Sequence, residues 1–282
     1  MNELLSIQKL NLFFELYKKN LQVLNEINLK VFKGEKVAVV GESGSGKSVM
    51  LRIILGLLKY RNSVIDGDVY FDSINLREQT ENYYRTNIRA KNISMIFQDP
   101  MAALNPVFTI RDQITNVIKL REKKLNNNQI EKIADEELKK VSIFDSKRVL
   151  DSYPFQLSGG MAQRILIIMA LMNKPKLVLA DEPSTALDVT LQKQALNLMN
   201  DLTNQVNAAV LLVTHNLGVV REFAERVYVI YKGNIVEEGL VEDIFNNPKH
   251  PYTVALLEAI PRLTGEGLPK FDENPPQYEK IK

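Results

Sequence analysis

Residues 41–48, GESGSGKS, combine residue types and a spacing that could bind phosphate groups. They fit the pattern G-x-x-x-x-G-K-[ST], in which glycines let backbone N–H groups converge on phosphate oxygens. Lys47 would contact the β- and γ-phosphates of a nucleotide, and the Ser48 hydroxyl would bind Mg²⁺. An apolar run precedes the segment and a helical pattern follows it, which is the context that the pattern requires. We therefore interpret it as a phosphate loop rather than an ordinary glycine–serine turn.

Polar side chains follow three further apolar runs of the sequence. Asp181 and Glu182 come after one run, His215 ends a second, and Gln98 follows a third. By themselves they could be strand-end polar groups or the acidic first turn of a helix. In parallel sheets, however, ligands bind at the carboxyl ends of the strands. Beside a phosphate loop, Asp181 suits the surroundings of Mg²⁺, Glu182 could orient a water, and Gln98 could reach either.

A second anion site is indicated by QLSGGMAQR, residues 156–164. Ser158, Gly159 and Gly160 precede an apolar run, and small residues with free N–H groups at a helix start can bind an anion. Taken alone, the stretch is better interpreted as the N-cap of a helix.

The elements that must position these residues follow from periodicity. Alternating runs at 4–14 and 23–32 predict strands, and continuous apolar runs at 36–40, 93–98, 176–180 and 208–214 predict buried strands of a parallel sheet. Hairpins are predicted at 63–76, turning near Asp66–Gly67, and at 226–239. Between about residues 99 and 158 apolar residues recur at helical spacing, as in Ile130, Ile133, Ala134, Leu138 and Val141, which indicates a helical insertion.

Composition narrows the class of protein. The chain has 282 residues, no cysteine and a formal net charge of +2, so disulfides and cysteine-based metal sites are excluded and nucleic acid is not an expected partner. The longest fully apolar run, Ile165–Met172, is far shorter than the roughly 20 residues that cross a bilayer. The N-terminal sequence does not resemble a signal peptide, and the tail from Thr264 is expected to be loosely ordered.

Together these motifs resemble the ATP-binding cassette (ABC) ATPases, the nucleotide-binding subunits of ABC transporters, over about residues 5–262. Residues 41–48 match the Walker A motif, Gln98 the Q-loop, Leu177–Asp181 Walker B, Glu182 the catalytic glutamate and His215 the switch histidine. Leu157, Ser158, Gly159, Gly160 and Met161 match the LSGGQ signature with Met at its last position, and Thr185–Asp188 (TALD) matches the D-loop with Thr in place of Ser.

The resemblance implies an α/β fold: a P-loop (RecA-like) ABC ATPase core with an antiparallel β subdomain, an inserted helical subdomain and a C-terminal extension. We expect an ATPase domain at residues 1–240 and the extension at 241–282. The implied nucleotide-binding set is Tyr17, Gly41, Ser43, Gly44, Ser45, Gly46, Lys47, Ser48 and Val49, with Ser48, Gln98 and Asp181 around Mg²⁺. Tyr17 would stack on adenine, with Phe14 as the alternative.

In this family two ATPase subunits clamp two ATP molecules head to tail. The resemblance implies that Glu182 polarises the attacking water, that His215 stabilises the γ-phosphate, and that the signature and Asp188 act on the ATP of the partner subunit. The implied partners are a second ATPase subunit (identical or homologous), two transmembrane permeases and an extracellular solute-binding protein. The implied location is the cytoplasmic face of the cell membrane, as a peripheral protein.

Two segments resemble the oligopeptide/dipeptide/nickel importer branch: residues 96–110 (IFQDPMAALNPVFTI) and residues 247–263 (NPKHPYTVALLEAIPRL). Many members carry an iron–sulfur cluster on cysteines of the extension; this chain has no cysteine, so none is predicted. His250 is interpreted as a surface turn residue. Peptides are the default cargo of the branch, with nickel or another metal complex as the alternative.

Three other functions fit the sequence less well. A soluble ABC ATPase of DNA repair or translation usually has coiled-coil insertions or two cassettes, and this chain has neither pattern. A GTPase would need N-K-x-D, but in NKPK (Asn173–Lys176) a lysine stands where the aspartate is required. A degenerate, non-hydrolytic partner is disfavoured because every expected catalytic residue is present.

Overall fold

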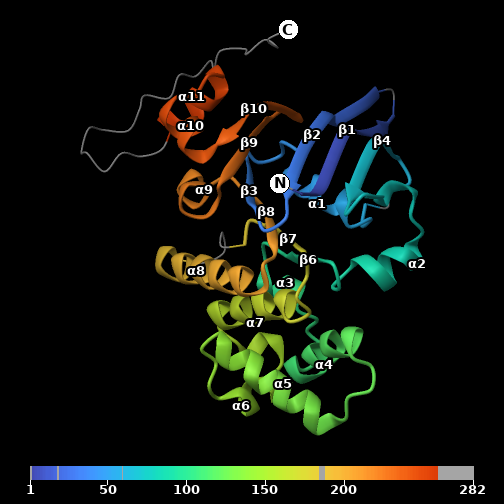
Figure 1. Ribbon diagram of the computed structural model, residues 1–282, viewed down its shortest axis with the longest axis vertical. Helices are drawn as coiled ribbons and strands as arrows, with labels where there is room; N and C mark the ends of the chain where they lie inside the picture. The colour runs from blue at the N-terminus through green and yellow to red at the C-terminus, as the bar shows by residue number, and fades with distance from the viewer. Residues whose placement is uncertain (1, 18, 59, 184–187, 260–282) are drawn as a thin grey trace.

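The computed structural model describes residues 2–17, 19–58, 60–183 and 188–259, and it contains two β-sheets (Figure 1). An antiparallel sheet has the strand order β2-β1-β4-β5, and a second sheet has the order β10-β9-β3-β8-β7-β6. The strands are β1 Glu3–Leu16, β2 Lys19–Phe32, β3 Lys36–Val40, β4 Ser63–Phe71, β5 Ile74–Asn75, β6 Ile93–Ile96, β7 Leu177–Asp181, β8 Ala209–Thr214, β9 Arg226–Tyr231 and β10 Asn234–Leu240.

The second sheet is parallel except at its β10 edge, where β10 pairs antiparallel with β9. Residues of β3, β7 and β8 are buried throughout, as continuous apolar runs covered on both faces require. Val40 of β3 lies opposite Thr214 of β8, and Asp181 of β7 lies opposite Val213. These strands therefore end level with one another, and the residues that follow them meet at one edge of the sheet.

The hairpin at 63–76 forms, but its predicted turn at Asp66–Gly67 is wrong. β4 runs straight through both residues, and the chain reverses at residues 72–73 before β5. Gly67 has φ +90°, and a Cβ there would lie 2.3 Å from the carbonyl oxygen of Lys9 on β1. β1 has one extra residue opposite Gly67, so the Asp-Gly pair marks a β-bulge instead of a turn.

The helices fill the space around the sheets, and α4 to α6 form a separate lobe beneath α7 and α8 (Figure 1). Thr109 and Asn126 cap α4 and α5 through reciprocal side-chain bonds with Asp112 and Gln129, which fixes where these helices begin. The helices are α1 Lys47–Ile54, α2 Glu81–Tyr83, α3 Pro100–Ala103, α4 Ile110–Arg121, α5 Asn127–Lys140, α6 Ser146–Asp151, α7 Gly159–Leu171, α8 Val189–Val206, α9 Leu217–Phe223, α10 Val241–Asn246 and α11 Pro251–Glu258.

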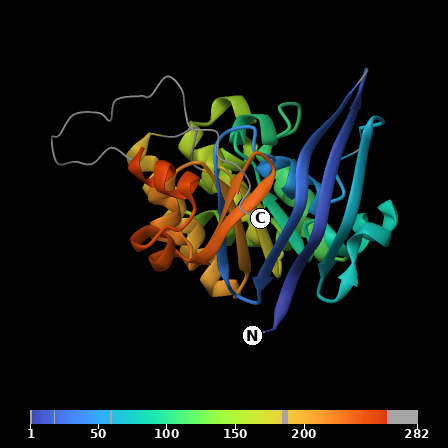
Figure 2. The same ribbon diagram turned by 90° about the horizontal axis from the view of Figure 1, so that it is seen from above.

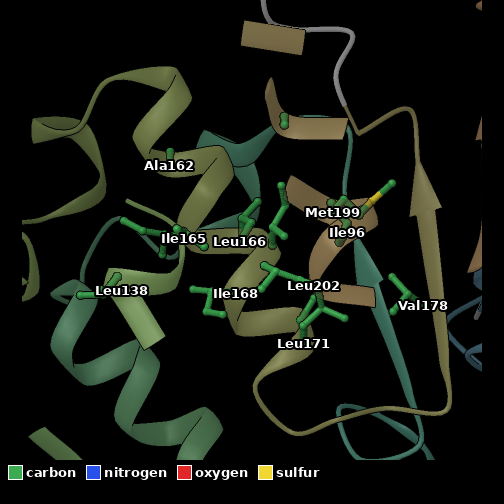
Figure 3. Packing of buried hydrophobic residues seen from close by; sticks show 14 of the residues in the cluster. Ile96, Leu138, Ala162, Ile165, Leu166, Ile168, Leu171, Val178, Met199 and Leu202 are labelled. Carbon is green, nitrogen blue, oxygen red and sulfur yellow. The ribbon is translucent and has the colours of Figure 1, made fainter. Parts of the chain in front are cut away.

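The core beneath the parallel sheet is built around α7, which is buried on almost every side. Figure 3 shows Leu166 and Ile168 of α7 among Met199 and Leu202 of α8 and Val178 of β7. On α5 the predicted apolar face is confirmed, since Ile130, Ala134, Leu138 and Val141 are buried in the same cluster. This packing joins the helical lobe to the sheet through α7, whose first turn carries the second predicted anion site.

After β10 the chain forms α10 and α11, which pack beside β9 and β10, away from the antiparallel sheet (Figures 1 and 2). Tyr252 of α11 is buried with Val241 and Ile244 of α10 against Val227 and Val229 of β9. Residues 260–282, including the tail predicted to be loosely ordered, lie outside the described residues. Among the described residues, no helix is both long enough and apolar enough to cross a membrane.

Candidate active site

The loop between β3 and α1 is shaped by its glycines. Gly46 has φ +97° and forms the N-cap of α1, and a Cβ at this position would lie 2.5 Å from the Leu24 side chain of β2. No other residue type fits this backbone and this contact, so the turn into α1 depends on glycine. Lys47 and Ser48 are then the first two residues of α1, at the positive end of its dipole.

Lys47 and Ser48 are both held in place by hydrogen bonds. The buried ammonium of Lys47 donates to the carbonyl oxygens of Gly41 (2.8 Å) and Glu42 (2.7 Å). Burial lowers the pKa of Lys47, while the nearby acidic groups of Glu182 and Asp181 act in the opposite direction. The Ser48 hydroxyl donates to the Asp181 carboxylate at 2.7 Å, so β3, α1 and β7 meet at one point.

Asp181 is the last residue of β7 and is buried. Burial raises its pKa above the ordinary value, and the bond from Ser48 partly opposes this rise. A buried carboxylate beside a hydroxyl provides the hard oxygen ligands that Mg²⁺ prefers, and Mg²⁺ needs only one or two such groups because it keeps several waters. Ser48 and Asp181 therefore fit a magnesium ion. Ser48 and Gln98 line one cavity, whereas the buried Asp181 is not among its lining residues and reaches it through Ser48.

Glu182, which follows β7, contacts polar side chains that follow β6 and β8. Its Oε2 accepts a hydrogen bond from Gln98 Nε2 (3.2 Å), and its Oε1 lies 2.8 Å from His215 Nδ1. The backbone of Glu182 is left-handed, with φ +44°, and its N–H donates to the carbonyl of Val213 on β8. Such strain in a non-glycine residue is typical of functional sites, and here it accompanies a carboxylate held between an amide and an imidazole.

These groups share one cavity of about 620 Å³, within the range of small-molecule sites. Among the predicted nucleotide-binding residues, Ser45 is buried beside Lys47, at 3.4 Å from its ammonium, and does not line the cavity. Tyr17 does not line it either: its side chain is 91% exposed beyond the end of β1, and the alternative, Phe14, packs edge-on against Tyr60. The cavity is lined by Val23, Gly41, Glu42, Ser43, Gly44, Gly46, Lys47, Ser48, Val49, Gln98, Glu182, His215 and Leu256.

The signature segment lies at a second, separate hollow of about 420 Å³. Ser158 caps α7 by accepting a hydrogen bond from the Met161 N–H at 3.3 Å, as the N-cap interpretation predicts. Asp188, the last residue of the D-loop match, caps α8 and lines the same hollow; residues 184–187 lie outside the described residues. The lining residues are Ser158, Gly159, Gly160, Met161, Arg164, Asp188 and Leu191, whereas the buried Leu157 is not among them.

Several lining residues were missed by sequence reasoning. Arg164 could have been predicted, because it lies four residues after Gly160 and hence on the same face of α7. Val23 and Leu256 reach the first cavity only through tertiary packing, and no local pattern indicated them, whereas Glu42 lies within the phosphate loop itself. The segment NKPK, which resembles part of the guanine-binding motif of GTPases, lies at the other end of β7. There Lys176 forms an ion pair with Asp72 at 2.5 Å, so the segment takes no part in the cavity.

Comparison with known proteins agrees with this geometry. Residues 24–185 match the family model described as ABC transporter, and residues 236–282 match the oligopeptide/dipeptide transporter C-terminal region. The oligopeptide transport ATP-binding protein AppD of Bacillus subtilis is 44% identical over 94% of this chain and 81% of its own length. The dipeptide transport ATP-binding protein DppD of the same organism is 44% identical over 98% of this chain and 83% of its length.

Solved structures give the same result for the fold. A dimeric bacterial ABC transporter cassette, MJ0796, superposes with a TM-score of 0.74 at 29% identity, covering 84% of this chain and 98% of that one. The same cassette is also known as a dimer in a post-hydrolysis state bound to ADP and phosphate, with the same TM-score. The predicted α/β cassette fold is therefore confirmed, and the chain belongs to the ABC transporter family as an ATP-binding, ATP-hydrolysing protein similar to the oligopeptide and dipeptide transport branch.

Proposed function

We propose that this chain is the ATPase subunit that powers peptide import through partner membrane permeases. The observation that carries the proposal is the convergence of the phosphate loop with Gln98, Glu182 and His215 in one cavity. The relatives named as oligopeptide and dipeptide transport ATP-binding proteins supply the cargo class and favour a transport role over an uncoupled soluble ATPase.

The residues divide the work of phosphoryl transfer among themselves. Backbone N–H groups at the start of α1 and the Lys47 ammonium bind the phosphates. Ser48, Gln98 and Asp181 would hold Mg²⁺, which supplies charge neutralisation between phosphate oxygens. Glu182 orients the attacking water, and His215 stabilises the charge that develops on the γ-phosphate.

The second hollow fits a role in trans. Its lining residues are distinct from those of the first cavity, and it offers a capped helix start with exposed Ser158 and Gly159. In a head-to-tail dimer, this hollow would cover the γ-phosphate bound to the phosphate loop of the other subunit, which is either a second copy or a homologous chain. ATP would then stabilise the closed dimer because it contacts both subunits only in that state.

A membrane partner is supported by exposed apolar side chains in the segments between α3 and α4 and between α6 and α7. We name Val107, Phe108, Tyr153 and Phe155 the apolar patch; their side chains are 75%, 50%, 39% and 67% exposed. The Ile110 N–H bonds the Ser152 carbonyl at 2.9 Å, which brings the two halves of the patch together, and Tyr153 stacks on Phe155. Clustered exposed apolar groups mark interaction sites, and we assign this one to a permease at the cytoplasmic membrane face.

Phe155→Asp is expected to abolish co-purification with the permeases and leave the ATP affinity of the isolated chain unchanged. The charge would be desolvated in an apolar interface, which costs several kcal/mol. Phe144→Asp is the matched control, because Phe144 is also exposed (77%) but lies outside the patch, between α5 and α6. Normal co-purification of Phe155→Asp would remove the patch from the permease interface.

Lys47→Ala is expected to weaken ATP binding about 10- to 100-fold, because a charge-assisted contact to phosphate is lost. Calorimetry with MgATP measures the effect. Lys33→Ala removes the same charge from an exposed surface site and should bind ATP normally. An unchanged affinity of Lys47→Ala would contradict the phosphate-loop assignment.

The same variant tests the cargo in cells. A strain in which Lys47→Ala replaces the wild-type chain should lose ATP-dependent uptake of labelled di- and oligopeptides. This loss includes the peptides that the cooperating solute-binding protein delivers. Loss of nickel uptake with intact peptide uptake would instead support the metal-complex alternative.

A further inference from the structure

The C-terminal helix α11 reaches the phosphate loop directly. The Glu42 N–H, in the second position of the loop, donates a hydrogen bond to the Tyr252 hydroxyl at 3.0 Å. One turn further along the helix, Leu256 lines the cavity that contains Lys47 and Ser48. Two residues of the extension thus contact the site at different places.

The position of α11 is fixed by several independent contacts. The Glu237 carboxylate of β10 accepts hydrogen bonds from the N–H groups of Lys249 (2.7 Å) and His250 (3.0 Å). His250 Nδ1 then accepts from the Tyr252 N–H at 3.1 Å and caps the helix, which is a more specific role than the surface turn predicted for it. The Tyr252 ring packs on Tyr231 of β9 at 4.2 Å between ring centroids.

The part of the phosphate loop that contacts Tyr252 also accepts the hydrogen bonds of the Lys47 ammonium. Glu42 donates its N–H to Tyr252 while its carbonyl accepts from the Lys47 ammonium. Gly41 lies so close to β9 that a Cβ would come within 2.1 Å of the Ile230 carbonyl oxygen. The first two residues of the loop are therefore confined between β9 and α11. Burial raises the pKa of Tyr252 to about 12, so the phenol stays neutral and keeps its hydrogen-bonding capacity at physiological pH.

The cavity itself has a polar and an apolar part. Lys47, Ser48, Gln98, Glu182 and His215 provide charged and polar groups for phosphates and Mg²⁺. The apolar side chains of Val23, Val49 and Leu256 provide a surface that suits a flat, uncharged ring. Tyr17, the aromatic residue predicted to stack on adenine, does not line this cavity.

We propose that the C-terminal extension is part of the nucleotide site: Leu256 packs against the nucleoside of ATP, and Tyr252 is a positioning residue for the phosphate loop. The proposal rests on the proposed ATPase function and adds a base-binding contact and a loop support from α11. It makes α11 necessary for full ATP affinity.

The two roles are separated by comparing ATP with inorganic tripolyphosphate, which has phosphates and no nucleoside. Leu256→Ala should raise the KM for ATP about 3- to 10-fold through lost apolar contact, and leave the affinity for Mg-tripolyphosphate unchanged. Leu257→Ala is the matched control, because Leu257 is also half-buried on α11 but does not line the cavity. It should leave both values unchanged.

Tyr252→Phe keeps the ring and removes the acceptor of the Glu42 N–H. It should raise the KM for ATP and the inhibition constant of tripolyphosphate by the same factor, about 5- to 30-fold, with little change in kcat. Tyr228→Phe is the control for a lost buried hydroxyl, since Tyr228 bonds Arg226 (2.6 Å) and the Lys30 N–H (3.1 Å) away from the cavity. It should lower Tm and leave the KM for ATP unchanged.

The outcomes distinguish failure of this inference from failure of the proposed function. A wild-type chain that binds neither ATP nor tripolyphosphate would overturn both. Normal wild-type binding, with unchanged constants in Leu256→Ala and Tyr252→Phe, would overturn only the role of α11. If Leu256→Ala weakened tripolyphosphate as much as ATP, the nucleoside contact would be wrong.

Discussion

Glu182→Gln should bind ATP with unchanged affinity and hydrolyse it about 10²- to 10⁴-fold more slowly, the usual contribution of a positioned general base. Glutamine has the same shape as glutamate and can keep the contacts with Gln98 and His215 that hold the side chain. It lacks the negative charge that orients and polarises a water. Because the closed state persists until hydrolysis, the variant should also accumulate as an ATP-bound dimer.

Stopped-flow phosphate release measures turnover, calorimetry measures binding, and size-exclusion chromatography with MgATP measures dimer accumulation. Glu222→Gln is a suitable control, because Glu222 is an exposed carboxylate on α9, 3.9 Å from Lys193, outside the cavity. Rapid turnover by Glu182→Gln would show that another group positions the water.

Gly159→Asp should lower the rate of ATP hydrolysis at least about 100-fold while ATP binding stays normal. The new carboxylate and the γ-phosphate are both negative, and bringing like charges together costs several kcal/mol. Gly159 is exposed in the first turn of α7, where an acidic residue is favourable to the helix, so the fold should tolerate the change. In a dimer, however, the new carboxylate would face the γ-phosphate held by the other subunit. Gly159→Asn, which has the same shape without the charge, should lose much less activity.

The trans role has a complementation test in dimers of two copies of this chain. Lys47→Ala disables the phosphate loop and Gly159→Asp disables the signature, so each variant alone is inactive. In a mixed dimer, the intact loop of one variant faces the intact signature of the other, and one complete site returns. Activity should therefore reappear on mixing, and its absence would indicate that the signature acts within its own subunit.

The catalytic groups were predictable because each belongs to a local pattern. The phosphate loop needs glycines at fixed positions, Asp181 ends a buried strand, and Glu182 and His215 come directly after buried strands. Parallel pairing then brings them together without further information. The local sequence does not show whether Asp66–Gly67 forms a bulge or a turn, because the outcome depends on the close approach of Lys9 from another strand.

The contribution of α11 could not be predicted for a related reason. Tyr252 lies 210 residues from Glu42, and only the packing of α11 on β9 brings them together. Tyr17 fits the spacing of an adenine-stacking residue, but it follows the last residue of β1, is exposed and does not line the cavity. Sequence spacing specifies neighbours along a strand and leaves the relative placement of separate elements open.

The left-handed backbone of Glu182 has a consequence for how this protein can be engineered. A glutamate at φ +44° costs about 1–3 kcal/mol of folding free energy, and the bond from its N–H to Val213 helps to hold it. Glycine would relieve that cost and remove the carboxylate at the same time. Selection of variants for thermostability alone would therefore favour replacing the residue on which turnover depends, and this position has to be fixed in any stabilisation campaign.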